Sequence, residues 1–103
     1  GEEQARLFLE ASGYQILAAN WRYGKAEIDL ICRFGTMLVF VEVKTRSGSG
    51  FGDPESFVSE RKIELMQEAA EAYAEETGWE GDLRFDIIAI GPGDALEHFE
   101  EAF

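Results

Sequence analysis

Residues 38–44 read Leu38-Val39-Phe40-Val41-Glu42-Val43-Lys44, an apolar run that ends in two charged side chains. Leu, Val and Phe favour strands, whereas Glu and Lys are poor strand formers and are costly to bury without partners. Because alternate residues of a strand share a face, this strand begins apolar on both faces and ends polar on one. The pattern predicts a central strand that leaves the core and enters a cleft. One face carries Leu38, Phe40, Glu42 and Lys44, and the other carries Val39, Val41 and Val43.

Apolar spacing on both sides of this strand predicts the other elements of the fold. Helical spacing marks residues 2–12 and 59–77, and strand patterns mark residues 14–21, 26–33, 37–46 and 83–90. Glycines predict a loop at residues 47–53, and Asp53-Pro54 opens a turn toward the second helix. A short tail follows, anchored by Leu96, Phe99 and Phe103. The order helix, three strands, helix, strand predicts one α/β domain over residues 1–103, a sandwich around a mixed four-stranded sheet.

The composition fits a single domain without covalent reinforcement. A chain of 103 residues can bury a core without a disulfide or a structural metal. The single cysteine, Cys32, alternates with Leu30 in an apolar strand and is interpreted as a core residue. No apolar run approaches the roughly 20 residues of a membrane span, and the start of the chain does not resemble a signal peptide. We therefore expect a cytoplasmic protein with no membrane partner.

The net charge of −12 is unevenly distributed along the chain. Residues 1–50 carry six acidic and six basic side chains, so the whole imbalance belongs to residues 51–103. An acidic protein repels nucleic acid at long range, and composition alone therefore argues against DNA binding. Much of the acidity lies on the outer face of the predicted second helix, at Glu60, Glu64, Glu68, Glu71 and Glu75. Its inner stripe consists of Ile63, Met66, Ala70 and Tyr73.

Acidic side chains face one another across the predicted hairpin of residues 26–33 and 37–46. In an antiparallel hairpin, two residues that lie directly opposite each other share a face, and their residue numbers have the same sum for every pair. If Asp29 and Glu42 are to share a face, that sum must be odd. A two-residue loop gives a sum of 69 and pairs Glu27 with Glu42, and a four-residue loop gives 71 and pairs Asp29 with Glu42. Either register opposes two carboxylates at about 5 Å between Cβ atoms, which destabilises a sheet unless a cation lies between them. Oxygen ligands with Lys44 nearby suit Mg²⁺ or Mn²⁺ better than Zn²⁺.

The first helix supplies one more acid near this end of the sheet. Glu2 shares a stripe with Ala5 and Leu9 at positions i, i+3 and i+7, which places it at the inward edge of the helix. Its ordinary interpretation is compensation of the helix dipole.

Four motifs together carry a resemblance to a known family. They are Gly1-Glu2 with Ala5, Ala26-Glu27-Ile28-Asp29-Leu30-Ile31, Phe40-Val41-Glu42-Val43-Lys44-Thr45-Arg46 and Arg84-Phe85-Asp86. In order and spacing they closely resemble the bacterial YraN-like family of small uncharacterised proteins, over nearly the whole chain. That family resembles archaeal Holliday-junction resolvases, within the restriction-endonuclease-like PD-(D/E)xK nuclease superfamily. The resemblance implies a restriction-endonuclease-like three-layer sandwich with an αβββαβ core.

The resemblance also implies a nuclease site. Asp29 and Glu42 would bind Mg²⁺ or Mn²⁺, and Lys44 would orient or activate the attacking water and offset phosphate charge. Glu2 would be an accessory acid that holds a metal-bound water. A divalent cation lowers the pKa of water and stabilises the charge that develops on the phosphate. The implied function is metal-dependent hydrolysis of DNA, on branched or structured substrates and by a homodimer if the chain follows the resolvases.

Several side chains keep two interpretations. Arg61 and Lys62 occupy the first turn of the second helix, where cations oppose the dipole but suit a phosphate. Arg46 follows Lys44 on the same strand face. Arg46, Arg61 and Lys62 are each interpreted either as a ligand of a DNA phosphate or as part of the solvated surface. Glu27 is a solvated neighbour or a further ligand. A function of another class also stays open, in which a non-catalytic module with this fold binds a protein partner through its acidic helix face.

Overall fold

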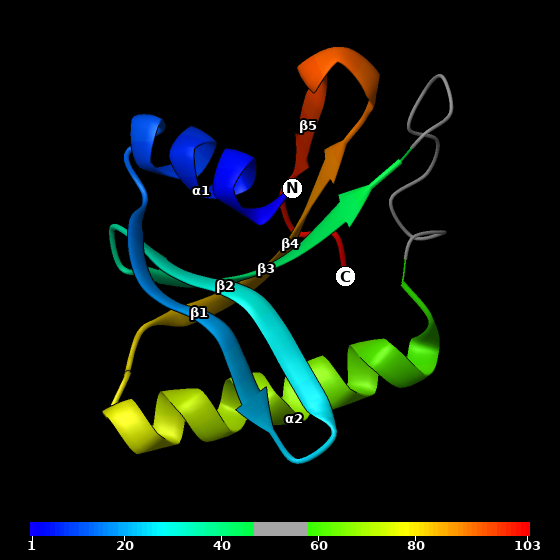
Figure 1. Cartoon of the computed structure of the whole chain (residues 1–103). Helices are drawn as coiled ribbons and strands as arrows, with labels where there is room; N and C mark the ends of the chain where they lie inside the picture. The colour runs from blue at the N-terminus through cyan, green and yellow to red at the C-terminus, as the bar shows by residue number, and fades with distance from the viewer. Residues whose placement is uncertain (47–57) are drawn as a thin grey trace.

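The computed structural model describes residues 1–46 and 58–103. Its elements follow the predicted order, and a further strand is added at the C-terminal end (Figure 1). The predicted loop at residues 47–53 and the turn at Asp53-Pro54 lie outside the described residues. The elements are α1 (Glu2–Ala11), β1 (Gln15–Tyr23), β2 (Ala26–Phe34), β3 (Met37–Thr45), α2 (Glu60–Thr77), β4 (Asp82–Ile90), the 3-10 turn η2 (Pro92–Asp94) and β5 (Leu96–Phe99).

The five strands form one mixed sheet in the order β1-β2-β3-β4-β5. β3 and β4 pair in parallel because the chain crosses through α2 between them, and all other neighbours are antiparallel. α1 covers one face of the sheet and α2 covers the other (Figure 1). The chain is therefore a mixed α/β domain, with two helices on opposite faces of a five-stranded sheet.

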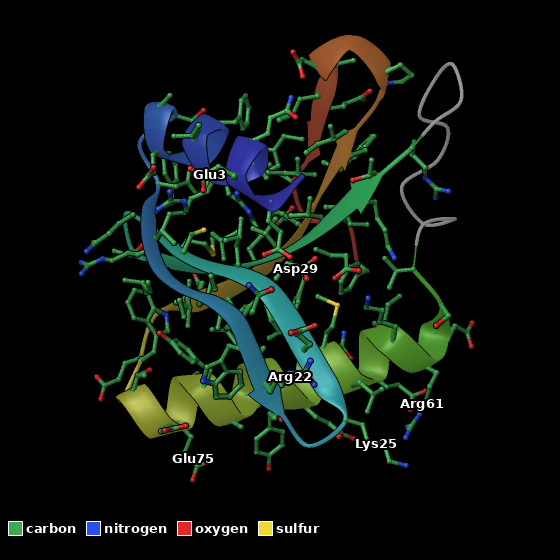
Figure 2. The ribbon with its side chains drawn as sticks, in the orientation of Figure 1. Glu3, Arg22, Lys25, Asp29, Arg61 and Glu75 are labelled. Carbon is green, nitrogen blue, oxygen red and sulfur yellow. The ribbon has the colours of Figure 1, made fainter. Side chains whose placement is uncertain are left out.

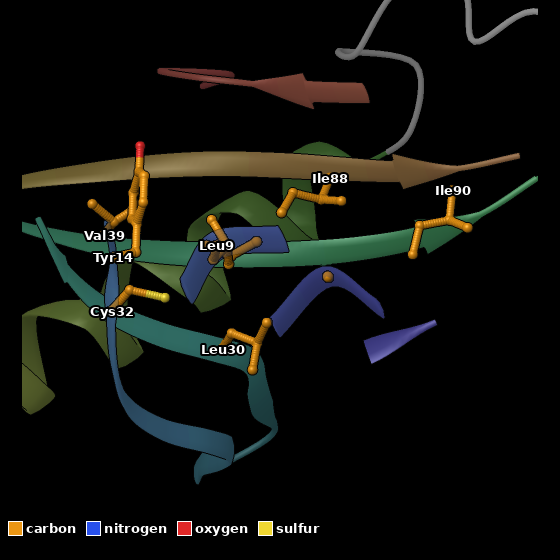
Figure 3. Close-up of a cluster of buried hydrophobic side chains, with 9 residues drawn as sticks. Leu9, Tyr14, Leu30, Cys32, Val39, Ile88 and Ile90 are labelled. Atoms are coloured by element: carbon orange, nitrogen blue, oxygen red, sulfur yellow. The ribbon is translucent and has the colours of Figure 1, made fainter. Parts of the chain in front are cut away.

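The two faces of β3 pack as its alternating pattern predicts. Val39 and Val41 join the buried cluster under α1, which Figure 3 shows around Leu9 and Tyr14. Leu38 and Phe40 join the cluster under α2, with Ala69 and Ala70 of that helix.

Cys32 lies in the cluster under α1, where it is fully buried. Burial, reinforced by the nearby negative charge of Asp86, raises the pKa of the Cys32 thiol to about 12. A thiol with so high a pKa is unreactive near neutral pH, so Cys32 is the core residue that the sequence predicts.

The hairpin of β2 and β3 has the second of the two predicted registers. Its pairs run from Phe34 with Met37 to Leu30 with Val41, and their numbers sum to 71. The turn between them contains only Gly35 and Thr36, so it is shorter than the four-residue loop predicted for this register. Gly35 has φ +62°, a left-handed conformation that favours glycine and permits so tight a turn.

The sheet has five strands where four were predicted, because the tail pairs with β4. Ile88 of β4 pairs with His98 of β5, and the chain beyond β5 folds back onto the sheet. The Phe103 ring stacks on Phe85 at 5.4 Å between centroids, and the Ala102 N–H donates to the Phe85 carbonyl at 2.8 Å. The predicted apolar anchors do hold the tail, but backbone pairing with the exposed edge of β4 makes part of it a strand.

Local signals set both ends of α2. Ser59 is the N-cap, and its Oγ accepts the N–H of Lys62 at 3.2 Å. Gly78 ends the helix in a left-handed conformation, with φ +71°. The buried stripe contains Met66, Ala69 and Ala70. The five glutamates predicted for the outer face are all exposed.

Candidate functional site

β2 and β3 separate at the level of Asp29. Their pairing stops at Leu30 and Val41, beyond which β2 continues beside β1 and turns away from β3 (Figure 1). β1 is distorted at the same level, where Asn20 has φ +52° and is missing from the register with β2. The N–H of Val43 donates to Oδ2 of Asp29 at 2.8 Å. The Asp29 carboxylate thus replaces a backbone acceptor at the point where the sheet opens.

Glu42 lies at this opening with one oxygen paired and the other unpaired. Its side chain is 2% exposed, on the face of the sheet that α2 covers. Oε2 contacts Nζ of Lys62 at 2.5 Å and Nζ of Lys44 at 3.3 Å. Oε1 is buried and has no hydrogen-bond partner. A buried carboxylate oxygen without a donor is unfavourable, and a bound cation would satisfy it.

Asp29 lies in an environment that disfavours its negative charge. Burial, together with the negative charges of Glu42 and Glu2, raises its pKa from the usual 3.8 to about 6, although the Val43 N–H opposes the shift. The carboxylates of Asp29 and Glu42, which the sequence predicts as metal ligands, therefore lie close enough to repel each other. A divalent cation between them would relieve that repulsion.

Glu2 lies near this pair but outside it. The start of α1 approaches the end of β3, since a Cβ on Gly1 would lie 3.2 Å from Oγ1 of Thr45. Helix phase placed Glu2 at the inward edge, yet its side chain is exposed while Ala5 and Leu9 are buried. Glu2 is close enough to help raise the pKa of Asp29.

The residues fit Mg²⁺ or Mn²⁺ as a pair of carboxylates rather than a complete cage. Within residues 1–46 and 58–103, no three His, Cys, Asp or Glu side chains form a group that could hold a metal ion. Mg²⁺ is ordinarily held by one or two carboxylates together with waters and substrate phosphates. The donor set of Asp29 and the free Oε1 of Glu42 suits that mode of binding.

Lys62 contacts one of the two predicted metal ligands directly. The sequence assigned it to a phosphate at the start of a helix, and the structure also gives it an ion pair with Glu42. Arg61, its neighbour, is mostly exposed and lies 3.7 Å from Oε2 of Glu64. Sequence spacing cannot show the Lys62 contact, because residues 42 and 62 meet only through the packing of α2 on the sheet.

A pocket of about 350 Å³ opens beside the carboxylates, between β2 and the start of α2. Lys25, Arg61 and Lys62 line it with Glu27 and Asp29, over an apolar floor that includes Leu65 and Met66. In Figure 2, Lys25 and Arg61 lie where the β1–β2 turn approaches α2, and Glu75 lies at the other end of that helix.

Arg46 and Glu27 occupy the margins of this site. Arg46 follows β3 directly, and its backbone N–H donates to the Ile90 carbonyl at 2.7 Å. Glu27 lies 3.5 Å from Nε of Arg22, across the β1–β2 pair.

A second buried polar cluster lies on the opposite face of the sheet, under α1. Arg84 forms two hydrogen bonds to Asp86, at 2.9 and 2.7 Å, and donates to the Tyr14 hydroxyl at 2.6 Å. Nε2 of His98 lies 2.7 Å from Oδ2 of Asp86. Burial alone would raise the pKa of Asp86, but the hydrogen bonds from His98 and Arg84 outweigh it and lower the pKa. Sequence reasoning noted Arg84 and Asp86 only as a motif, although their i, i+2 spacing places them on one strand face.

No helix in the described part of the chain is both long enough and apolar enough to cross a membrane.

Comparison with known proteins gives a family match without an activity. The model of the uncharacterised protein family UPF0102 matches residues 1–90. A UPF0102 protein of Cytophaga hutchinsonii is 47% identical over 90 residues, which cover 87% of this chain and 80% of the relative. UPF0102 protein FP2501 of Flavobacterium psychrophilum is 44% identical over 106 residues, covering 100% of this chain and 89% of the relative.

Among solved structures, Pyrococcus furiosus SfsA in complex with Ca²⁺ is similar at 16% identity and a TM-score of 0.35. The match covers 94% of this chain and 58% of that one. Similarity at this level does not establish a shared fold.

Proposed function

We propose that this chain, which belongs to the uncharacterised protein family UPF0102, is a metal-dependent nuclease that hydrolyses DNA phosphodiester bonds. Membership in the family confirms the YraN-like resemblance of its motifs. The observation that carries the proposal is the buried, unpaired Oε1 of Glu42, beside Asp29 and two lysines. A carboxylate with a strongly perturbed pKa beside a pocket, such as that of Asp29, is a candidate for a functional site.

The fold proposed for this function is the restriction-endonuclease-like sandwich. The order αβββαβ and the parallel pairing of β3 with β4 support it. The placement of the acidic pair and Lys44 at the point where β2 and β3 separate also supports it. β5 would then be an addition to the common core.

The side chains divide the chemistry between them. Asp29 and Glu42 would hold Mg²⁺ or Mn²⁺, and the Val43 N–H fixes the orientation of Asp29 through Oδ2. When bound, the cation would lower the pKa of the attacking water and add positive charge beside the phosphate. Lys44 contributes a further fixed positive charge on the same strand face. Glu2, at the start of α1, would orient a water from the edge of the site.

The positions of the cations support DNA as the substrate despite the net charge of −12. Lys25, Arg61 and Lys62 gather around the pocket next to the carboxylates. Much of the acidity lies on the outer face of α2, and the site is on the inner side of that helix. These three cationic side chains can therefore receive a phosphate backbone, and binding would weaken as salt is raised. Branched or structured DNA is the proposed substrate class, by the resemblance to resolvases.

Cleavage assays test this function directly. Purified protein is incubated with Mg²⁺ or Mn²⁺ and with linear duplex, single-stranded and four-way-junction DNA. We expect cleavage that EDTA stops and that Glu42→Gln and Lys44→Met strongly reduce. Glu64→Gln is the matched control, because it makes the same chemical change on the exposed outer face of α2. Wild-type protein that cuts none of the three substrates with either metal would rule the nuclease out.

A second function is supported by the acidic face itself. Glu60, Glu64, Glu68, Glu71 and Glu75 form an exposed row along α2, well suited to a basic protein partner. A variant with Gln at Glu64, Glu68, Glu71 and Glu75 would lose that partner but keep DNA cleavage. Asp29→Asn would do the reverse, so the two variants separate a binding module from an enzyme.

A further inference from the structure

We propose that Lys62 is a built-in counter-ion of Glu42 that gives way to the divalent cation and then binds the substrate phosphate. Cation and nucleic acid would consequently bind cooperatively. This inference rests on the proposed function and adds a mechanism by which the site stays inactive until its substrate arrives. In this scheme Lys62 is first the counter-ion of Glu42 and then a phosphate-binding residue.

The contacts of Glu42 carry the first step. Two ammonium groups, those of Lys62 and Lys44, share the single oxygen Oε2, and the other oxygen has no donor. Lys44 belongs to the same strand as Glu42 and is two residues away. Lys62 comes from the first turn of α2, and its ammonium group contacts Glu42 on β3. Of the two lysines, only Lys62 lines the pocket beside the carboxylates.

The charge of the site carries the second step. Asp29 and Glu42 carry two negative charges when ionised, and Lys44 and Lys62 supply two positive ones. A divalent cation that enters this nearly neutral cluster meets two ammonium groups, which oppose its binding by like-charge repulsion. The repulsion falls if one ammonium moves away toward an anion. A DNA phosphate brought to the pocket is such an anion.

The pocket gives Lys62 a place to move. Its side chain is 39% exposed, and the pocket beside it holds about 350 Å³. Lys25 and Arg61 already line this space, so a phosphate there would be shared by three cationic side chains. The long, flexible stem of a lysine can exchange one anionic partner for another without movement of the backbone. The N-cap at Ser59 keeps the start of α2 in place during the exchange.

Cooperativity between the two ligands follows from this exchange. Each ligand removes an obstacle to the other, because the cation releases Lys62 and the phosphate retains it. Coupling of this kind is reciprocal, so DNA must tighten cation binding by the factor by which the cation tightens DNA binding.

Calorimetric titration with Ca²⁺, an oxygen-seeking cation like Mg²⁺, measures the coupling without relying on activity. Wild-type protein and Lys62→Met are titrated alone and with a four-way DNA junction. We expect Lys62→Met alone to bind Ca²⁺ about tenfold more tightly than wild type, and the junction to tighten Ca²⁺ binding about tenfold in wild type only. Lys62→Arg, which keeps the charge, should behave as wild type. Arg61→Met, which removes a charge one residue away, should leave the affinity for Ca²⁺ alone unchanged.

Each outcome decides a different question. Equal Ca²⁺ affinity in wild type and Lys62→Met, or no binding to either, overturns the exchange. If wild type still cleaves DNA with Mg²⁺, the nuclease proposal survives that result. Tighter binding by Lys62→Met in a protein that cuts no DNA would support the exchange and overturn the nuclease. If Lys62→Met fails to fold by circular dichroism, Lys62→Gln replaces it in the same titration.

Discussion

Two carboxylates are buried on neighbouring strands and opposite faces of the sheet, and they differ in how many hydrogen-bond partners they have. Asp86 on β4 is 0% exposed and Glu42 on β3 is 2% exposed. Asp86 accepts from Arg84 through both oxygens, contacts His98 at 2.7 Å and accepts the Glu101 N–H at 3.2 Å. Glu42 has two lysines on one oxygen and no partner on the other.

The difference separates a carboxylate whose hydrogen bonding is complete from one that could still accept a ligand. Burial is nearly the same for both, so burial does not identify the site. The planar guanidinium of Arg84 fixes Asp86 through two parallel hydrogen bonds, whereas the lysine ammonium groups leave Glu42 with capacity for another ligand. Glu42 differs from Asp86 because its Oε1 has no hydrogen-bond partner while two flexible lysine side chains share its Oε2.

Asp86→Ala should produce the largest loss of stability. It leaves the Arg84 guanidinium buried without its main partner, and we expect the free energy of unfolding to fall by about 3–5 kcal/mol. Urea denaturation followed by circular dichroism measures the loss. Glu100→Ala is the control, since its exposed contact with Arg84 at 3.2 Å should contribute no more than about 1 kcal/mol. A loss for Asp86→Ala no larger than the control would contradict a structural role.

Glu42→Gln should act on catalysis rather than on folding. It keeps the shape of the side chain and removes the charge that would hold a cation, so we expect the cleavage rate to fall by about 10²–10³-fold. The free energy of unfolding should change far less than it does in Asp86→Ala. Single-turnover cleavage and urea denaturation of the same preparation give both values. A fully active Glu42→Gln would place the site elsewhere.

Asp29→Asn should stabilise the cation-free protein while it abolishes the proposed DNA cleavage. The folded protein holds the Asp29 carboxylate at a cost, and Asn can still accept the Val43 N–H. We expect the free energy of unfolding at pH 7 to rise by about 1–2 kcal/mol. Thermal denaturation in EDTA measures the gain, and Glu68→Gln on the exposed face of α2 serves as the control.

The two regions should also respond to pH in opposite directions. The pKa of Asp29 is raised to about 6 in the folded protein, so the native state gains a proton before the unfolded state does as pH falls from about 7 to about 4. The advantage of Asp29→Asn over wild type should therefore shrink across that range. Asp86 has a lowered pKa, so its contribution persists to the usual value of 3.8 and is lost only below it. Unfolding curves for wild type and Asp29→Asn at several pH values would expose a wrong sign.

Ser59→Ala should have the smallest effect. Loss of the N-cap hydrogen bond to Lys62 should lower the free energy of unfolding by about 1 kcal/mol. Because this cap also holds the turn that carries Lys62, cation affinity should shift with it. Thr77→Ala, at the exposed far end of the same helix, should leave cation affinity unchanged. Equal cation affinities in Ser59→Ala and Thr77→Ala would show that the N-cap does not influence the site.

Much of the fold could be predicted from periodicity in the sequence. The alternation in residues 38–44 assigns Val39 and Phe40 to opposite faces, as the two clusters confirm. The requirement that Asp29 and Glu42 share a face limits the β2–β3 hairpin to two registers. The sequence pattern does not distinguish these two registers, because the geometry of the turn determines which one forms. The fifth strand was missed because four residues are too few for a clear pattern.

The candidate site was less accessible to prediction where contacts are non-local. The motif locates Asp29, Glu42 and Lys44, since all three lie on one hairpin. The pairing of Lys62 with Glu42 depends on how α2 crosses the sheet, and no local pattern encodes it. The left-handed conformation of Asn20, at the level where β2 leaves β3, is not marked by any local sequence pattern either.

The two-residue turn between β2 and β3 bears on the order of events during folding. Strands joined by so short a connection meet early, because little chain entropy is lost in closing the loop. β4 and α2 reach β3 only through a long crossover. Asp29 and Glu42 would accordingly be brought together in the transient hairpin before Lys62 arrives to neutralise them. The same like-charge repulsion that suits the folded site to a cation would then slow the first step of its assembly, and a divalent cation in the refolding buffer should accelerate it.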